Sequence, residues 1–482
     1  MLFNSIDFAV FLPIVFILYW YATHKNLKLQ NLLIVVASYT FYGWWDWRFL
    51  LLIIFSTIID YTIGIKLKKE DSVLKRKALL WTSIAVNLGF LGFFKYYNFF
   101  LDNFITAFSF FGTEIKANSL NIILPVGISF YTFQTLSYTI DVYKEKLEPT
   151  KDFIAFSAFV SFFPQLVAGP IERAAHLLPQ FYKKRSFDYT KAVDGMRQIL
   201  WGLFKKIVIA DNCAEYANQI FNNSADMNGS TLVLGALFFT FQIYGDFSGY
   251  SDIAIGTSRL FGFDLMRNFN FPYFSRDIAE FWRRWHISLS TWFRDYLYIP
   301  LGGSRGGTWM KIRNTFIIFI VSGFWHGANW TFIVWGALNA IYFLPLLLTN
   351  NNRNNLETVA QGKLFPSIKE FSFMLLTFGL TVFAWIFFRA NDIGHATSYI
   401  SEIFSTSLFA IPVFAERGKA FIVLVLLMLF ILLEWQGREG SYAISQLGLK
   451  WKRPYRWGLY LGLISIIFIM TGKEQQFIYF QF

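Results

Sequence analysis

Long apolar runs, separated by short polar or basic loops, follow one another along almost the whole chain. A bilayer core about 30 Å thick needs roughly 20 apolar residues per helix. By this measure the predicted membrane helices are 8–22, 31–44, 49–65, 79–94, 122–140, 153–168, 232–244, 316–348, 371–388, 421–433 and 457–470. With the long run 316–348 counted twice, the total is about 12 membrane segments. We therefore expect an all-α polytopic membrane protein.

The run 316–348 contains no Asp, Glu, Lys or Arg and is too long for one crossing. As a single helix at ~1.5 Å per residue it would extend about 50 Å, well beyond the bilayer core. Small and polar residues at 323–329, among them Gly323, Gly327 and Asn329, favour a break there. We expect two segments that meet near His326, at membrane depth.

The chain divides into three zones that differ in how often polar and small residues interrupt the apolar runs. Residues 1–143 are ordinary hydrophobic spans, and plain spans return after the polar stretch 350–369. Over 162–342 the runs are interrupted by Gly, Pro, Arg, Asp, Ser and His, which is typical of broken or re-entrant helices that line a cavity. We interpret 1–482 as one integral membrane domain with a catalytic core at 162–342. The aromatic end of the chain is expected to dock against protein or the membrane interface.

Composition agrees with this class, because 55% of the 482 residues are hydrophobic, 21% are aromatic and only 15% are charged. The net charge of +12 is explained by basic cytoplasmic loops beside anionic lipid. No nucleic-acid-binding motif accompanies this charge. Membrane lipid is therefore an expected partner, and nucleic acid is not.

The distribution of basic residues also predicts an orientation. Lys25 and Lys28 follow the first span and a basic cluster at 66–77 follows the third, whereas only Arg48 lies in the second loop. By the positive-inside rule, the amino terminus is expected outside the cytoplasm. The first apolar run lacks a basic leader and a clear cleavage site, so we expect it to remain as a helix.

His326 is the first candidate for chemistry, because ionisable groups at membrane depth are costly and usually face a protein interior or a water-filled cavity. The near-neutral pKa of an imidazole suits it to take a proton from a hydroxyl. Ser322 and Asn329 are candidates to orient this ring or to donate to a developing oxyanion, and Trp325 is a candidate for the cavity wall. The alternative is a packing histidine that bonds a backbone carbonyl.

The densest polar segment is 268–303. As a helix from about Asp277, it would place Trp282, His286 and Ser290 on one face, with Arg283 and Arg294 toward other sides. The alternative is an amphipathic interfacial helix with aromatic anchors and arginines that face lipid.

Intramembrane carboxylates need partners, which makes several further residues candidates for the lining of a cavity. These are Asp246, Ser248, Tyr250 and Asp295, with the arginines of 268–303 as the expected partners of the carboxylates.

Several other kinds of site are excluded. Cys213 is the only cysteine and no His-Glu-x-x-His sequence occurs, so neither a disulfide nor a metal site is expected. No Gly-x-Ser-x-Gly elbow and no phosphate-binding Gly-x-x-x-x-Gly-Lys sequence is present. His24, His176 and His395 have polar neighbours at span ends or in loops, and we interpret them as surface residues.

Five segments together resemble the membrane-bound O-acyltransferase family, in its bacterial branch of alginate O-acetyltransferase membrane subunits and peptidoglycan O-acetyltransferases. The segments are 124–134, 163–171, 244–252, 268–303 and 324–327. The resemblance implies a curved wall of helices around a central funnel, with an acyl donor entering from the cytoplasm and an acceptor from outside. His326 matches the central catalytic histidine of the family, and His286 matches its second characteristic histidine.

The function that the resemblance implies is O-acetyl transfer in the bacterial cytoplasmic (inner) membrane, with His326 as general base. No permanently bound cofactor is expected, and acetyl-coenzyme A is the expected donor substrate. Its phosphates are candidate partners for Arg283, Arg284, Arg294, Lys205 and Lys206, although positive-inside topology explains these residues equally well.

A separate periplasmic or surface acetyltransferase is an expected partner, because no sizeable extracytoplasmic domain is evident in the chain. The final acceptor would be a cell-envelope polysaccharide. D-alanyl or other acyl transfer to teichoic acid is one alternative, and an acyl-histidine intermediate stays open. A proton-coupled transporter that uses the buried histidine is a second alternative.

Overall fold

The computed structural model describes residues 1–112, 118–472 and 475–480, and every regular element in these ranges is helical. The predicted all-α class is thereby confirmed for the described chain. Two compact units are distinguished, one formed by residues 1–192 with 257–266 and the other by 193–256 with 267–482.

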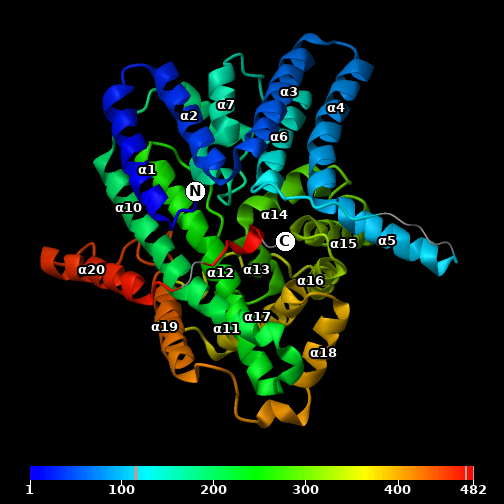
Figure 1. The fold of residues 1–482 in the computed structure, drawn as a ribbon, viewed down its shortest axis with the longest axis vertical. Helices are drawn as coiled ribbons and strands as arrows, with labels where there is room; N and C mark the ends of the chain where they lie inside the picture. The colour runs from blue at the N-terminus through cyan, green and yellow to red at the C-terminus, as the bar shows by residue number, and fades with distance from the viewer. Residues whose placement is uncertain (113–117, 473–474, 481–482) are drawn as a thin grey trace. The chain divides into compact units, whose positions relative to one another are not determined.

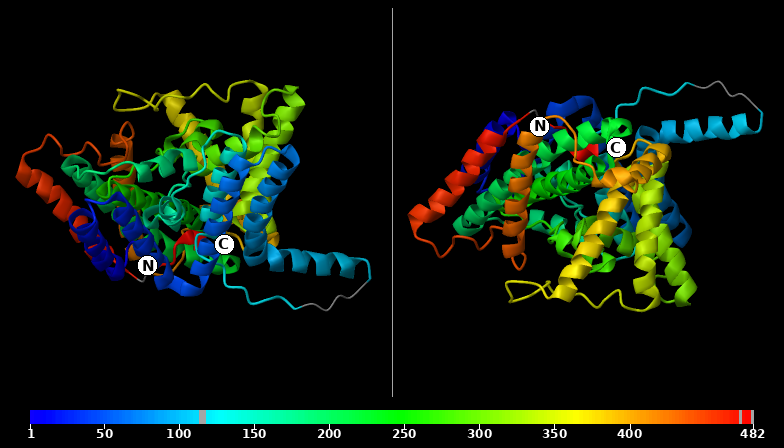
Figure 2. Two further views of the ribbon diagram at one scale, coloured as in Figure 1. Left: turned by 90° about the horizontal axis from the view of Figure 1, so that it is seen from above. Right: turned by 90° about the horizontal axis from the view of Figure 1, so that it is seen from below.

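The first unit is a helical bundle. Its elements are α1 (Ile6–Ile17), α2 (Leu27–Asp46), α3 (Leu50–Lys69), α4 (Val73–Leu91), α5 (Tyr97–Phe110), α6 (Ile128–Tyr143), α7 (Phe153–Ser161), α8 (Phe163–Leu166) and α9 (Ala174–Leu177). The neighbouring helices α3 and α4 both pack against α6 (Figure 1). Within the same unit, α5 extends away from these three helices (Figure 2).

A buried carboxylate joins α3, α4 and α6. Asp60 accepts hydrogen bonds from Ser83 Oγ at 2.5 Å, Asn87 Nδ2 at 2.9 Å and Thr139 Oγ1 at 3.2 Å. Since buried polar groups are costly unless they are hydrogen-bonded, this network holds the three helices in one register.

The second unit contains most of α10 (Tyr189–Leu203) and α12 (Gly229–Leu260), together with η5 (Phe204–Asp211) and α11 (Asn212–Asn222). Its remaining longer helices are α13 (Ile278–Arg284), α14 (Ile287–Phe293), α15 (Gly307–His326), α16 (Trp330–Leu348), α17 (Ile368–Arg389), α18 (Ile393–Ile403), α19 (Arg417–Gln436) and α20 (Arg453–Met470).

Six helical segments of the described chain are long and apolar enough to cross a membrane. They are Leu27–Lys69, Val73–Phe110, Gly229–Leu260, Trp330–Leu348, Ile368–Arg389 and Arg417–Gln436. Shorter apolar helices occupy Ile6–Ala22 and Phe153–Leu166. The larger total of about 12 segments stays a prediction.

Two helix boundaries differ from the hydrophobic pattern. The run 122–140 is irregular up to Gly127, which has φ 75°, and α6 begins only at Ile128, because Pro125 and a left-handed residue cannot belong to a regular helix. The predicted span 232–244 is instead part of α12, which continues unbroken through Asp246 to Leu260.

The predicted break in 316–348 is confirmed. Helix α15 ends at His326 and α16 begins at Trp330, with the Asn329 side chain accepting a hydrogen bond from Thr331 N at 3.0 Å as an N-cap. The two helices pack closely at Gly323, where an added Cβ would collide with the Phe332 carbonyl oxygen. This close packing holds the end of α15, and with it His326, against α16.

Candidate functional site

Two interruptions of helix bring His286 and His326 together in the second unit. His326 is the last residue of α15, and His286 lies between α13 and α14 with φ 44° and ψ 53°. Their ring centroids are 6.5 Å apart, and the residues are only 1% and 2% exposed. Water is therefore largely excluded from both rings.

The structure corrects the expectation of one continuous helix from Asp277. The chain turns at His286 into the left-handed region, so Trp282 and Ser290 lie on two different helices. A non-glycine residue in this conformation is uncommon and is typical of functional sites whose surroundings hold it in place. The turn positions the imidazole in a way that helical periodicity does not predict.

Aromatic rings surround the His326 imidazole. The centroids of Trp325, Trp335, Phe388 and Tyr479 lie 4.9, 5.2, 5.3 and 5.5 Å from its own. Trp335 comes from α16 and Phe388 from α17, so three helices and the C-terminal segment contribute to the wall. An apolar wall of this kind excludes water and strengthens electrostatic interactions within it.

The His286 ring is held by one amide. Its Nδ1 lies 3.1 Å from Asn268 Oδ1, and within the described ranges its buried Nε2 has no hydrogen-bond partner. The Phe247 ring packs edge-on against it at 4.6 Å. Burial lowers the pKa of the His286 imidazole to about 3, which keeps the ring neutral near pH 7.

The C-terminal segment reaches the same place, as its aromatic composition predicts, with Phe477 and Ile478 1% and 0% exposed. Ile478 N donates to Asp246 Oδ2 at 2.6 Å, and the Tyr479 ring contacts both imidazoles. In Figure 1 this segment, drawn in red, lies beside α13 and α14. The expected docking of this end is confirmed for 475–480.

The buried carboxylates of α12 are paired with lysines and not with the expected arginines. Lys206 Nζ lies 2.8 Å from Asp246 Oδ1 and 2.8 Å from Asp211 Oδ1, and Lys205 Nζ lies 2.6 Å from Asp252 Oδ2. For Asp246 the arginine prediction is wrong, because the lysines of η5 pack along α12. For Asp295 it is confirmed, because the partner is Arg294. The internal partners of Lys205 and Lys206 disfavour these lysines as ligands of phosphate.

The arginines of 268–303 have other partners. Arg283 donates to the carbonyl oxygens of Asn352 and Asn355, at 2.7 and 2.8 Å, and Arg284 pairs with Glu280 at 2.9 Å. Arg294 and Asp295 pair with each other at 2.7 Å, with the Arg294 side chain 59% exposed. Only this last pair is open to solvent or lipid headgroups.

The other predicted lining residues differ in how near they come to the two histidines. Trp282 packs on Trp335, at 5.7 Å between centroids, and so supports the wall beside His326. Ser322 is buried one turn before His326. Ser290 is bonded to the Trp285 carbonyl oxygen, at 3.4 Å.

Asn329 caps α16 and also donates to Asn391 O at 2.7 Å, so both of its polar side-chain atoms are engaged in local structure. In α12, Ser248 and Tyr250 are buried, and the Tyr250 ring packs on Phe477 at 4.5 Å. Tyr250 therefore packs against the C-terminal segment.

Four residues of the site were not among the sequence candidates: Asn268, Trp335, Phe388 and Tyr479. Asn268 opens the polar segment 268–303, and Tyr479 lies in the aromatic end, so a local signal existed for these two. Trp335 and Phe388 lie in apolar spans that carry no local sign of a site.

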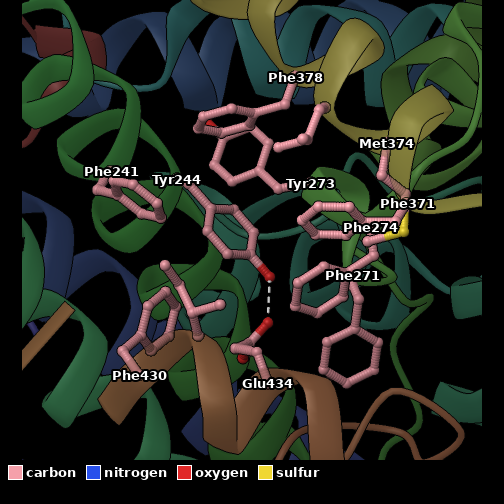
Figure 3. Close-up of a pocket in the computed structure, with 12 residues that line it drawn as sticks. Phe241, Tyr244, Phe271, Tyr273, Phe274, Phe371, Met374, Phe378, Phe430 and Glu434 are labelled. Atoms are coloured by element: carbon pink, nitrogen blue, oxygen red, sulfur yellow. Dashed lines mark hydrogen bonds between the residues drawn. The ribbon is translucent and has the colours of Figure 1, made fainter. Parts of the chain in front are cut away.

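A separate cavity of about 270 Å³ lies in the same unit, lined by aromatic and aliphatic side chains of α12, α17 and α19 (Figure 3). Among the described residues that line it, the one carboxyl group is that of Glu434, which accepts hydrogen bonds from Tyr244 Oη at 2.6 Å and from Trp201 Nε1 at 3.2 Å. Such a lining suits an apolar chain better than a nucleotide. Within the described ranges, no three His, Cys, Asp or Glu side chains are grouped as ligands for a metal ion.

Comparisons with known proteins show which family the chain is similar to. A family model of MBOAT, the membrane-bound O-acyltransferase family, matches residues 142–384, which include both histidines. The chain is 38% identical to the probable alginate O-acetylase AlgI of Pseudomonas putida, over 506 aligned residues that cover 100% of both chains.

Two further relatives differ in their acyl group or acceptor. A peptidoglycan O-acetyltransferase of Helicobacter pylori is 32% identical, with 100% of this chain and 98% of the relative aligned. A teichoic acid D-alanyltransferase of Bacillus subtilis is 30% identical, over only 46% of this chain and 58% of the relative.

Proposed function

The chain belongs to the membrane-bound O-acyltransferase family, and on that premise we propose that it moves acetyl from a cytoplasmic thioester to a cell-envelope polysaccharide, with His326 as general base. It is thus an O-acyltransferase and a multi-pass membrane protein. The observation that carries the mechanism is the buried pair of imidazoles, 6.5 Å apart, inside an aromatic wall.

In the proposed reaction, His326 takes the proton of the acceptor hydroxyl while the hydroxyl oxygen forms a bond to the thioester carbonyl carbon. The carbon–sulfur bond then breaks, and the sulfur leaves with the proton as a free thiol. Positioned base catalysis contributes roughly 10²- to 10⁴-fold to such a step. Orientation of the two substrates and exclusion of water by the aromatic wall would supply the remainder.

Acetyl-coenzyme A is the donor that we propose, with the cytoplasmic membrane as the location and the amino terminus outside the cytoplasm. The acetyl group would pass to the polysaccharide directly or through a periplasmic or surface acetyltransferase. The acetyl-transferring relatives match over the whole chain and the D-alanyl transferase over less than half of it, which favours acetyl over D-alanine. Membership of an acyltransferase family disfavours the transporter alternative.

Replacement of His326 by Ala tests the mechanism. We expect ester-linked acetate on envelope glycans to fall by about 100-fold or more, because the base is lost while the bulk of the helix packing remains. The measurement is acetate released by mild alkali from glycans of cells that express each variant, with immunoblots of membranes to show equal amounts of protein.

The matched control is His24→Ala, which removes an exposed histidine and should leave acetylation unchanged. Wild-type acetylation in the His326→Ala variant would refute the role of this ring as the base.

A further inference from the structure

The hydrogen bonds of Asn268 determine which of its side-chain atoms is the oxygen. One atom, Oδ1, receives Ser288 N at 3.3 Å and Ser288 Oγ at 2.9 Å, while Nδ2 donates to Ser251 Oγ at 3.1 Å. A backbone N–H can only donate, so the atom that faces it is an acceptor. Asn268 is fully buried, and no solvent competes for these bonds.

The same oxygen lies 3.1 Å from His286 Nδ1. Because this oxygen accepts, Nδ1 must carry the proton, and in the neutral ring Nε2 then holds the lone pair. The lowered pKa that burial gives His286 agrees with a neutral ring. Nε2 is therefore a hydrogen-bond acceptor, and in the described chain no donor reaches it.

Backbone contacts hold the two residues in this relation. Asn268 O accepts from Ile287 N at 2.9 Å, and Asn270 N donates to Arg284 O at 2.9 Å, so 268–270 binds the turn on both sides of His286. The turn needs this support because His286 has φ 44°, a strained conformation for a residue with a Cβ. Side chain and backbone of one short segment thus fix both the tautomer and the direction of the ring.

We propose that Asn268 is a positioning residue that holds His286 as the Nδ1–H tautomer, so that its Nε2 accepts a hydrogen bond from a second hydroxyl of the acceptor, beside the hydroxyl that His326 deprotonates. His326 and His286 would then share one hydroxyl-bearing substrate between them, with different tasks. The identity of this ligand rests on the proposed function, whereas the tautomer rests on the hydrogen bonds alone.

The tautomer is testable without turnover. The chain has only five histidines, so the full-length protein labelled with ¹⁵N-histidine in detergent gives few ring-nitrogen signals, and His286→Gln identifies those of His286. Protonated and unprotonated ring nitrogens resonate far apart. We expect a protonated Nδ1 and an unprotonated Nε2 in the wild type, and in Asn268→Asp as well, because a carboxylate also accepts.

In Asn268→Leu the acceptor is lost, and we expect the His286 signals to move toward the Nε2–H form or toward a mixture of the two forms. The control is Asn314→Leu, which removes another fully buried asparagine, bonded to the carbonyl oxygens of Leu301 and Gly303. This control should leave the His286 signals unchanged. An Nε2–H ring in the wild type, or unchanged signals in Asn268→Leu, would overturn the proposal.

The second test of the proposal measures acetyl transfer in membrane vesicles, with radiolabelled acetyl-coenzyme A as the probe and labelled glycan as the product. Asn268→Leu should lower kcat by at least about 10-fold at pH 7, while Asn268→Asp retains the reaction. The carboxylate in Asn268→Asp stabilises the imidazolium and raises the pKa of His286. The pH at which the ¹⁵N ring signals of His286 change to those of the imidazolium should therefore be higher in Asn268→Asp than in the wild type.

A purely structural asparagine would change protein yield or stability in these variants without moving the titration of the His286 signals, and an unmoved titration in Asn268→Asp would therefore contradict the proposal. If wild-type vesicles label no glycan while the ¹⁵N signals are as expected, the proposed function fails and the tautomer stands. The two failures are thus distinguishable.

Discussion

Lys206 compensates two largely buried carboxylates beside the candidate site. Its ammonium group lies between Asp211 and Asp246 and also donates to Gln475 O at 3.2 Å. All three charged side chains are almost fully buried, so each charge depends on the others for compensation. At this scale, stability and site geometry depend on the same groups, because Asp246 also holds the C-terminal segment.

Replacement of Lys206 by Met is expected to destabilise the folded protein by about 3–5 kcal/mol, because two buried carboxylates lose their counter-ion. Thermal unfolding of the purified protein in detergent measures this. Lys419→Met is the matched control, since that lysine pairs with Glu416 on an exposed surface and its loss should leave the unfolding temperature nearly unchanged. Equal unfolding temperatures for the two variants would contradict the role of Lys206.

At the scale of elements, the site depends on helix ends and on one close helix contact. His326 ends α15 and His286 interrupts the chain between α13 and α14, so neither ring lies in the middle of a regular helix. The contact of α15 with α16 at Gly323 keeps the end of α15 in place one turn before His326. The distance between the two rings is therefore sensitive to the separation of these helices.

Gly323→Ala should destabilise the protein by about 1–3 kcal/mol and reduce acetylation, because the added methyl group forces α15 away from the Phe332 carbonyl oxygen. Gly379→Ala is the matched control. It also lies within a helix, but a Cβ there meets nothing within 4 Å, and the better helix propensity of Ala should preserve or slightly raise stability. Unfolding temperature and glycan acetate are the two measurements, and similar results for both variants would remove the packing argument.

At the scale of the whole molecule, residues far apart in the sequence complete the site. Ile478 donates to Asp246 across 232 positions, and Trp201 donates to Glu434 across 233 positions. Ile478 and Tyr479 thereby become part of the wall around Asp246 of α12, His326 of α15 and the turn at His286 in the same unit. Loss of one long-range hydrogen bond is expected to affect the site although it lies in the final residues.

Ile478→Pro removes the N–H that bonds Asp246, while Ile478→Val keeps it. We expect the proline variant to lower the unfolding temperature and to reduce acetylation, because a buried carboxylate oxygen loses its donor and Tyr479 loses its position. The valine variant should remain close to wild type in both measurements. A proline variant with normal acetylation would show that the C-terminal segment is dispensable for the site.

The sequence alone determined the helical class, the break at His326 and the two histidines worth testing. Each depends on local properties: long apolar runs, small residues inside a charge-free run, and ionisable groups where lipid is expected. The resemblance to the acyltransferase family added the expected reaction, O-acetyl transfer, and the comparisons confirmed the family.

Only the tertiary structure decided the left-handed turn at His286, the pairing of Asp246 with Lys206, and the approach of Asn268 and Tyr479. Helical periodicity places Trp282, His286 and Ser290 on one face, but contacts of 268–270 with the turn outweigh local helix preference. Pairing across hundreds of positions depends on which helices pack together, and no local pattern encodes it. The physical reason is that a buried charge or imidazole takes its partner from whatever backbone and side chains the fold brings near.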